Sequence, residues 1–116
     1  MGLSIQMGIK RNILFIRFNG ELDHMTCESL KIRTCEILEK YYIKHLILNF
    51  EKLSFMDSSG IGYIIGRFSQ LKKRSGKIVL CSINDLIMRL VNLSGLRKIC
   101  LIARDEDEAQ EFLEVA

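Results

Sequence analysis

Polar and apolar residues alternate over short stretches of this chain, and apolar residues recur every three or four positions over longer ones. Alternation is typical of a half-buried strand, whereas the longer period is typical of a helix that packs by one face. The alternating or largely apolar stretches predict five strands, over residues 4–10, 13–18, 45–50, 77–82 and 98–103. A tight turn at Arg11-Asn12 joins the first two strands into a hairpin, which Asn19-Gly20 ends.

Four helical stretches separate or follow these strands. The positions expected to face the core are Leu30, Thr34, Ile37, Leu38 and Tyr41; Ile61, Ile64, Ile65, Phe68 and Leu71; Ile87, Leu90 and Val91; and Ala109, Phe112 and Leu113. The residues expected to cap the helix starts are Asp23 or Thr26 for the first helix, Asp85 for the third and Asp105 for the last. The first three helices are expected to end near Tyr42, Gly76 and Gly95.

The resulting order, β-β-α-β-α-β-α-β-α, indicates an α/β fold whose later strands are parallel and joined by right-handed crossovers. In residues 45–50 and 77–82, apolar and polar positions alternate only partly. Strands covered on both faces are more uniformly apolar. We therefore predict a mixed five-strand sheet that opens with a hairpin and carries most of its helices on one face.

Length and charge narrow the class of protein. The 116 residues suit one domain, spanning 1–116. The net charge of +3 is mild, so a nucleic-acid partner is not expected. No apolar run approaches the ~18 residues of a membrane span, and the N-terminus does not resemble a secretory signal. We expect a cytoplasmic protein with no membrane partner.

The cysteines and histidines do not form a metal-binding pattern. No two cysteines have C-x-x-C spacing, and the chain has only two histidines. A cytoplasmic protein keeps its thiols reduced. We therefore predict no metal site and four free thiols, at Cys27, Cys35, Cys81 and Cys100.

The clearest candidate chemistry lies in Leu53–Gly62, between the third strand and the second helix. Asp57 is followed there by two hydroxyl residues, Ser58 and Ser59, and then by glycine. The carboxyl ends of parallel strands are the usual binding edge of an α/β sheet, and helix N-termini present free amide hydrogens there. The residues alone leave two interpretations open, a binding site and an ordinary helix cap.

Known catalytic motifs do not fit this stretch. Met56–Gly60 is not the G-x-S-x-G turn of serine hydrolases, and the chain has no G-x-x-x-x-G-K-[ST] phosphate loop. A phosphate-receiver domain would need an acidic cluster after its first strand and a lysine after its fifth. This chain opens with a hairpin instead, and Ala103–Asp105 follows its last strand.

Three segments, Gly20–His24, Leu53–Gly62 and Leu93–Leu96, resemble the anti-sigma factor antagonists of the STAS family. The Asp-Ser-Ser-Gly motif between Phe-Met and Ile-Gly is similar to that of the sporulation members. The predicted order of strands and helices also matches, so the resemblance covers nearly the whole chain.

The resemblance implies a regulator without enzymatic activity. Such a protein binds an anti-sigma factor that is also a serine kinase, and thereby releases the sigma factor. The kinase phosphorylates the serine after the aspartate, which is Ser58 rather than Ser59, and the complex separates. A PP2C-type phosphatase restores the active form. No cofactor is implied for this chain, because ATP and ADP belong to the partner kinase.

The resemblance also implies a partner-binding surface, made of Asp23, His24, Asp57, Ser58, Ser59, Gly60, Ile61, Gly62, Ser94, Gly95 and Leu96. Local roles compete at several positions: Asp23 suits a helix cap, Ile61 a core residue and Ser94–Leu96 a helix stop. Two alternative functions remain, a regulatory domain that binds a small molecule or nucleotide at the same edge, and an enzyme of unknown chemistry.

Overall fold

A five-stranded mixed sheet forms the centre of the computed structural model, which describes residues 2–114. The strands lie in chain order: β1 (Leu3–Lys10), β2 (Ile13–Leu22), β3 (His45–Met56), β4 (Ile78–Cys81) and β5 (Leu101–Ala103). β1 pairs antiparallel with β2 in the predicted hairpin, and every later neighbour is parallel. The carboxyl ends of β2 to β5 therefore share one edge.

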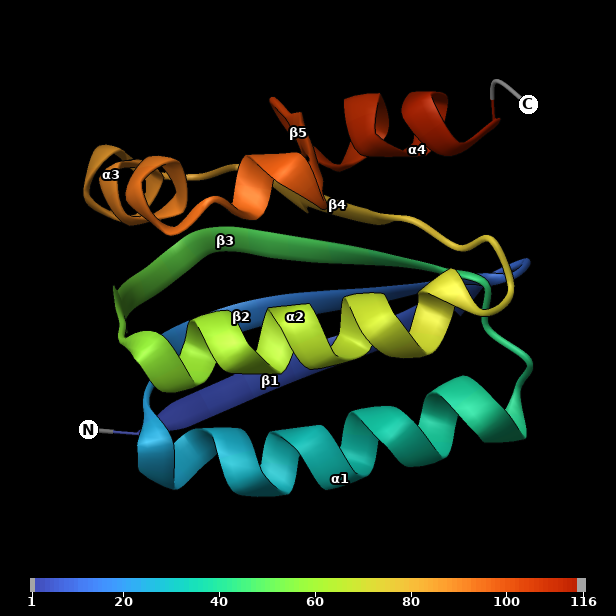
Figure 1. Cartoon of the computed structure of the whole chain (residues 1–116), viewed down its shortest axis with the longest axis horizontal. Helices are drawn as coiled ribbons and strands as arrows, with labels where there is room; N and C mark the ends of the chain where they lie inside the picture. Colours follow the sequence, from blue (N-terminus) through green and yellow to red (C-terminus); the bar gives the residue numbers. More distant parts are fainter. Residues whose placement is uncertain (1, 115–116) are drawn as a thin grey trace.

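Helices cover the two faces of the sheet unequally. They are α1 (His24–Lys40), α2 (Ser58–Lys72), α3 (Asp85–Ser94), the 3₁₀ helix η1 (Leu96–Lys98) and α4 (Glu106–Glu114). Helices α1 and α2 run side by side across one face, α3 packs at its edge, and α4 lies on the other side (Figure 1). The predicted fold class, an α/β mixed sheet with helices mostly on one face, is confirmed.

Two apolar clusters result from this arrangement. The larger lies under α1, α2 and α3 and includes Leu14, Leu48 and Ile64, all fully buried. The smaller lies under α4, where Ile47 and Val79 pack with Ala109. Helix α4 covers only part of its face of the sheet. One side of each strand is therefore fully apolar and the other is partly polar, which explains the imperfect alternation in the sequence.

Two strands continue well beyond their predicted ends. β2 runs to Leu22 instead of Phe18, and β3 runs to Met56 instead of Phe50. The β2–β3 register shifts twice, between Arg17 and Asn19 and again at Gly20, so the period-two pattern is interrupted while the strands still pair. Asn19-Gly20 thus lies within β2 and does not end it.

Two other predicted boundaries, both in the C-terminal half, were wrong. The strand predicted over 98–103 begins only at Leu101, and the segment before it forms η1, from which Leu96 and then Cys100 point into the core. The cap of α3 is Asn84, whose side chain accepts from the Ile87 amide at 2.9 Å, and not Asp85.

Three residues predicted to face the core are exposed instead: Tyr41, Ile65 and Phe112. Tyr41 is the residue that ends α1, so it lies beyond the packed turns. The buried face of α2 centres on Tyr63 and Ile64, which turns Ile65 outward. Helix α4 buries only Ala109 fully, and Phe112 lies outside that contact.

Candidate functional site

The starts of α1 and α2 lie beside each other at the carboxyl edge of β2 and β3 (Figure 1). Leu22 and Met56, the last residues of these strands, are paired across the sheet. The Asp57 amide continues the pairing by donating to the Leu22 carbonyl at 3.3 Å. Each strand is followed at once by an aspartate that caps the next helix. The sheet register therefore brings Asp23 and Asp57 to one edge.

Asp23 forms a reciprocal cap with Thr26. The Thr26 amide donates to Asp23 Oδ1 at 3.0 Å, and the Asp23 amide donates to Thr26 Oγ1 at 2.9 Å. This capping box settles the open choice between the two residues, since Asp23 is the cap and Thr26 its partner. The Thr26 amide also stabilises the carboxylate and lowers the pKa of Asp23. His24 follows as an exposed residue in the first turn.

Asp57 caps α2 and leaves Ser58 free. The Asp57 carboxylate accepts from the Ser59 amide at 2.8 Å, and Asp57 and Ser59 are half-buried. Ser58, the first residue of α2, is exposed. A helix N-terminus favours negative charge, because its first amide groups lack acceptors within the helix. The Ser58 hydroxyl is thus accessible for modification, in a position where an added phosphate fits the local backbone field.

The three residues after Ser59 differ in their surroundings. Gly60 is buried, and a Cβ there would lie 2.5 Å from Met56 Cγ and 3.1 Å from Leu22 Cγ, so a glycine allows α2 to approach the strands. Ile61 is partly buried against the main core. Gly62 is exposed with open space at its Cβ position. Gly60 and Ile61 therefore support the site, whereas Gly62 contributes to its surface.

Ser94 ends α3, Gly95 caps that end and Leu96 begins η1. Gly95 adopts φ 80°, a left-handed conformation that glycine accepts without strain, and the Leu96 amide donates to Ser94 Oγ at 3.3 Å. Leu96 is only 1% exposed and belongs to the main core. Within residues 2–114, no hydrogen bond links this segment to residues 57–62. The structure gives it the helix-stop role.

A groove between α1 and α2, which the sequence analysis did not identify, extends from this edge. Its volume is about 240 Å³, and it is lined by His24, Cys27, Glu28, Lys31, Ser59, Gly62, Tyr63, Gly66 and Arg67. Gly62 and Gly66 lie one helical turn apart on α2, and this spacing was the available signal. Burial raises the pKa of the Cys27 thiol to about 11, so that cysteine is a poor nucleophile.

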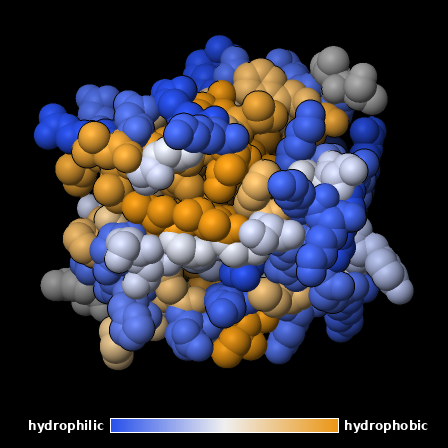
Figure 2. Space-filling model, viewed as in Figure 1, coloured by the Kyte–Doolittle hydropathy of each residue, from blue (hydrophilic) through white to orange (hydrophobic). Residues whose placement is uncertain are grey.

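Apolar side chains also gather on the other flank of α2. Figure 2 shows them between α2 and the segment that holds α3 and η1. Ile61 and Phe68 of α2 and Leu90 of α3 are among the partly buried residues packed against the core. Leu86 and Leu93 of α3 are largely exposed. An apolar surface thus lies close to the start of α2.

A hollow of about 690 Å³ lies on the α4 face of the sheet and away from Ser58. Three of its polar side chains are paired with one another. Arg17 donates from Nε and Nη2 to the Glu106 carboxylate at 2.8 Å each, and Asn49 donates to Glu106 at 2.7 Å. Arg17 lowers the pKa of Glu106. None of residues 57–62 lines this hollow, so it gives no support to a small-molecule or nucleotide site beside the Asp-Ser-Ser-Gly motif.

Residues 2–114 contain neither a metal-binding cluster nor a membrane-spanning helix. No cluster of three or more His, Cys, Asp or Glu side chains is placed to hold a metal ion in that part of the chain. All four cysteines are free thiols; Cys35 is half-buried and the other three are buried. No helix among these residues has both the length and the apolar character needed to cross a bilayer.

Known proteins share both the sequence and the fold of this chain. The sequence profile of the STAS domain family matches residues 4–109. An anti-sigma F factor antagonist of Paenibacillus polymyxa is 37% identical over 99% of this chain and 98% of that protein. A solved structure of the anti-sigma factor antagonist SpoIIAA in its unphosphorylated form has a TM-score of 0.79 and 27% identity, covering 97% of this chain and all of that one.

The phosphorylated form of the Bacillus cell fate determinant SpoIIAA matches as well. Its structure has a TM-score of 0.76 and 31% identity over 96% of this chain and all of that one. The predicted resemblance to sporulation members of the family is thus confirmed. The sequence match and the fold agree: this chain belongs to the STAS domain family and groups within it with the anti-sigma factor antagonists.

Proposed function

We propose that this chain is an anti-sigma factor antagonist that is switched off by phosphorylation of Ser58. In the unphosphorylated form, the edge with the starts of α1 and α2 binds an anti-sigma factor that is also a serine kinase, and the sigma factor is released. The kinase then modifies Ser58, which ends binding, and a PP2C-type phosphatase removes the phosphate. The chain itself has no enzymatic role and needs no cofactor.

The observation that carries this proposal is the placement of Ser58. It is exposed at the first position of α2, while the neighbouring Asp57 and Ser59 are held in the cap. A phosphate at this position adds about two negative charges to a surface without disturbing a buried contact. The relatives support the same reading, because SpoIIAA has solved structures in phosphorylated and unphosphorylated forms.

The proposed surface combines residues of the two helix starts. Asp23, His24, Ser58 and Gly62 contribute exposed or half-buried atoms there. Ser94 and Gly95 lie at the end of α3 and belong to the surface only if the partner reaches across to that helix. Because the partners act on transcription, we expect this switch to operate in the cytoplasm.

The direct test incubates the purified chain with ATP, with and without its cognate anti-sigma factor. Intact mass should rise by about 80 Da, one phosphoryl group, only in the presence of that kinase. The Ser58→Ala variant should stay unmodified and still bind the kinase, whereas Ser59→Ala should be modified normally. Modification of Ser58→Ala but not of Ser59→Ala would move the acceptor to Ser59.

A further inference from the structure

A buried arginine in the α1–α2 groove lacks partners for part of its guanidinium group. Arg67 is only 6% exposed, although it lines the groove. Its Nε donates to Gln70 Oε1 at 3.1 Å, but its Nη1 is buried without any hydrogen-bond partner within residues 2–114. Nearly all buried donors are paired in folded proteins, and arginine keeps its charge at neutral pH. The free chain therefore leaves a charged donor unsatisfied.

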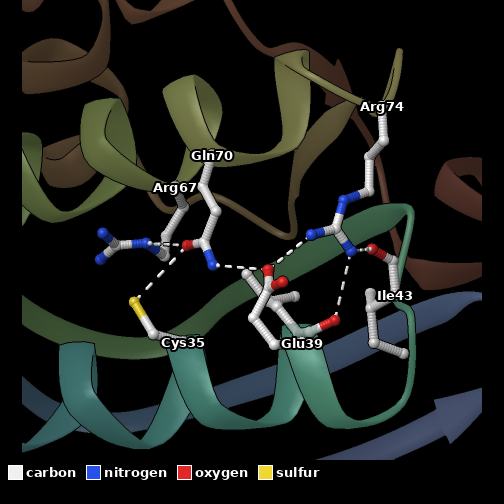
Figure 3. A network of polar contacts seen from close by, with 7 residues as sticks. Cys35, Glu39, Ile43, Arg67, Gln70 and Arg74 are labelled. Carbon is white, nitrogen blue, oxygen red and sulfur yellow. Dashed lines mark hydrogen bonds and ion pairs between the residues drawn. The ribbon is translucent and has the colours of Figure 1, made fainter.

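Neighbouring acceptors are already engaged elsewhere. Gln70 also accepts from the Cys35 thiol and donates to Glu39, while Glu39 pairs with Arg74 (Figure 3). This network holds Arg67 by its Nε side and leaves the remaining nitrogens directed away from Gln70 (Figure 3). No carboxylate in the described part of the chain forms an ion pair with Arg67.

The aromatic ring of Tyr63 supports the guanidinium without satisfying its donors. The Arg67 guanidinium carbon lies 5.2 Å from the centre of that ring, within the range of a cation–π contact. The Tyr63 hydroxyl forms a 2.8 Å hydrogen bond with Thr34, and within residues 2–114 no hydrogen bond joins it to Arg67. The arginine is thus held in place with free donors, as a preformed recognition group would be.

The groove gives a second molecule room to reach this group. Gly62 and Gly66 have open space where a Cβ would stand, so α2 presents bare backbone along the groove. The groove begins at His24 and Ser59, beside the proposed phosphorylation site. Its charged lining is Lys31, Arg67 and the opposing Glu28, which leaves an excess of one positive charge.

We propose that this groove receives a carboxylate side chain of the anti-sigma factor, which pairs with Arg67 and satisfies its free donors. A carboxylate matches the planar donor pattern of a guanidinium and compensates its charge. The anti-sigma factor is the expected occupant because the groove is continuous with the edge around Ser58, so this inference rests on the proposed function. An apolar side chain would leave the buried charge unpaired, at a cost in affinity.

The first test measures the affinity of the unphosphorylated chain for its purified cognate anti-sigma factor, with the nucleotide on the kinase held constant. Arg67→Met keeps an unbranched, flexible side chain and removes the charged donors, and should weaken binding at least tenfold. Each exposed Asp and Glu of the partner is then replaced by Ala. One of these partner variants should bind the wild-type chain at least fivefold more weakly. The same partner variant should bind Arg67→Met no more weakly than the unchanged partner does. A purely structural role of Arg67 would not produce this coupling.

A second variant keeps the test decisive if Arg67→Met folds poorly. Gly66→Leu adds bulk to the groove and keeps Arg67 itself. The space at the Cβ position is open and leucine is a better helix former than glycine, so the melting temperature should not fall. Its affinity should drop at least tenfold. The matched control is Ser69→Leu, at an exposed position of the same helix outside the groove lining, which should bind normally.

Glu28 provides the rival explanation, in which its side chain turns inward to pair with Arg67 in solution. In that case Glu28→Gln would lower the melting temperature and Arg67→Met would leave affinity unchanged. Normal binding by Gly66→Leu and Arg67→Met, or the absence of any coupled acidic residue on the partner, would overturn the groove proposal alone. A wild-type chain that fails to bind the anti-sigma factor would overturn the proposed function as well.

Discussion

Phosphorylation of Ser58 should weaken binding strongly while leaving the fold almost unchanged. Ser58 is exposed at the start of α2, so the added group displaces no buried atom. An anion near a helix N-terminus is favourable by about 0.3–1 kcal/mol. Repulsion from the neighbouring Asp57 carboxylate opposes this by a similar amount, since exposed charge pairs contribute about 0.2–1 kcal/mol. The two effects nearly cancel, and the net change in the free energy of unfolding should stay within about 1 kcal/mol.

This free energy converts into a small change in melting temperature. Unfolding of a chain of this length has an entropy of about 240 cal/mol/K, so 1 kcal/mol corresponds to about 4 °C. Binding is affected far more, because a dianion placed in a contact surface must be desolvated or accommodated, at a cost of several kcal/mol. Even a loss of about 3 kcal/mol reduces affinity more than a hundredfold.

The assay compares both forms of the chain by calorimetric melting and by titration with the anti-sigma factor, with nucleotide held constant. Ser58→Ala incubated with the kinase serves as the control for handling. Ser58→Asp should reproduce part of the weakening, since it adds less charge. A drop in melting temperature of more than about 10 °C on phosphorylation, over twice the expected limit, would show that unfolding and not surface exclusion ends binding. Equal affinities of the two forms would remove the switch.

Three further predictions concern stability and chemistry. Gly60→Ala should lower the free energy of unfolding by about 1–3 kcal/mol in denaturant titration, because the new Cβ meets Met56; an unchanged midpoint would contradict this packing. The pKa of Glu106 lies below its ordinary value of 4.5, so the pairing with Arg17 stabilises the fold fully above that pH. This stabilisation is lost as the pH falls through the lowered pKa. Melting temperature should therefore fall less steeply with acidity in Glu106→Gln than in the wild type. Thiol titration of unfolded, unreduced protein should recover four free thiols, those of Cys27, Cys35, Cys81 and Cys100. Recovery of two or fewer would contradict this assignment.

The order of the main strands and helices and the cap of α1 followed from local sequence signals, whereas the cap of α3 did not. Asp23 and Asp57 each precede a helical pattern, and a capping side chain acts within a few residues of its own position. Strand lengths did not follow in the same way. After Phe50 the chain continues with two charged residues, and the β2–β3 pairing absorbs two register shifts. How far two strands stay paired depends on the residues of both strands. The pattern within one segment therefore does not predict where the strand ends.

The sequence located the part of the candidate site that lies within a single motif. It did not predict the groove that α1 and α2 form together. Ser58 was placed correctly at a helix start, because the Asp-Ser-Ser-Gly motif contains its own cap. Arg67 gave no signal, because a charged residue on a helix is usually exposed and its burial here depends on α1 and Tyr63. Leu96 was expected on the partner surface through the family resemblance, yet its burial arises from the core contacts of η1.

The long end of β3 has a consequence for amide exchange with solvent. β4 pairs with β3 only over Leu46–Asn49, whereas β2 accompanies β3 as far as Met56. The last part of β3 therefore has a partner strand on one side only, and on the open side the Asn84 side chain donates to the Leu53 carbonyl at 2.9 Å. Deuterium uptake in residues 50–56 should accordingly divide into slow amides directed at β2 and fast amides on the open side. A ligand that covers this side would slow the second group alone, and so would report contact next to Ser58 without a label on either protein.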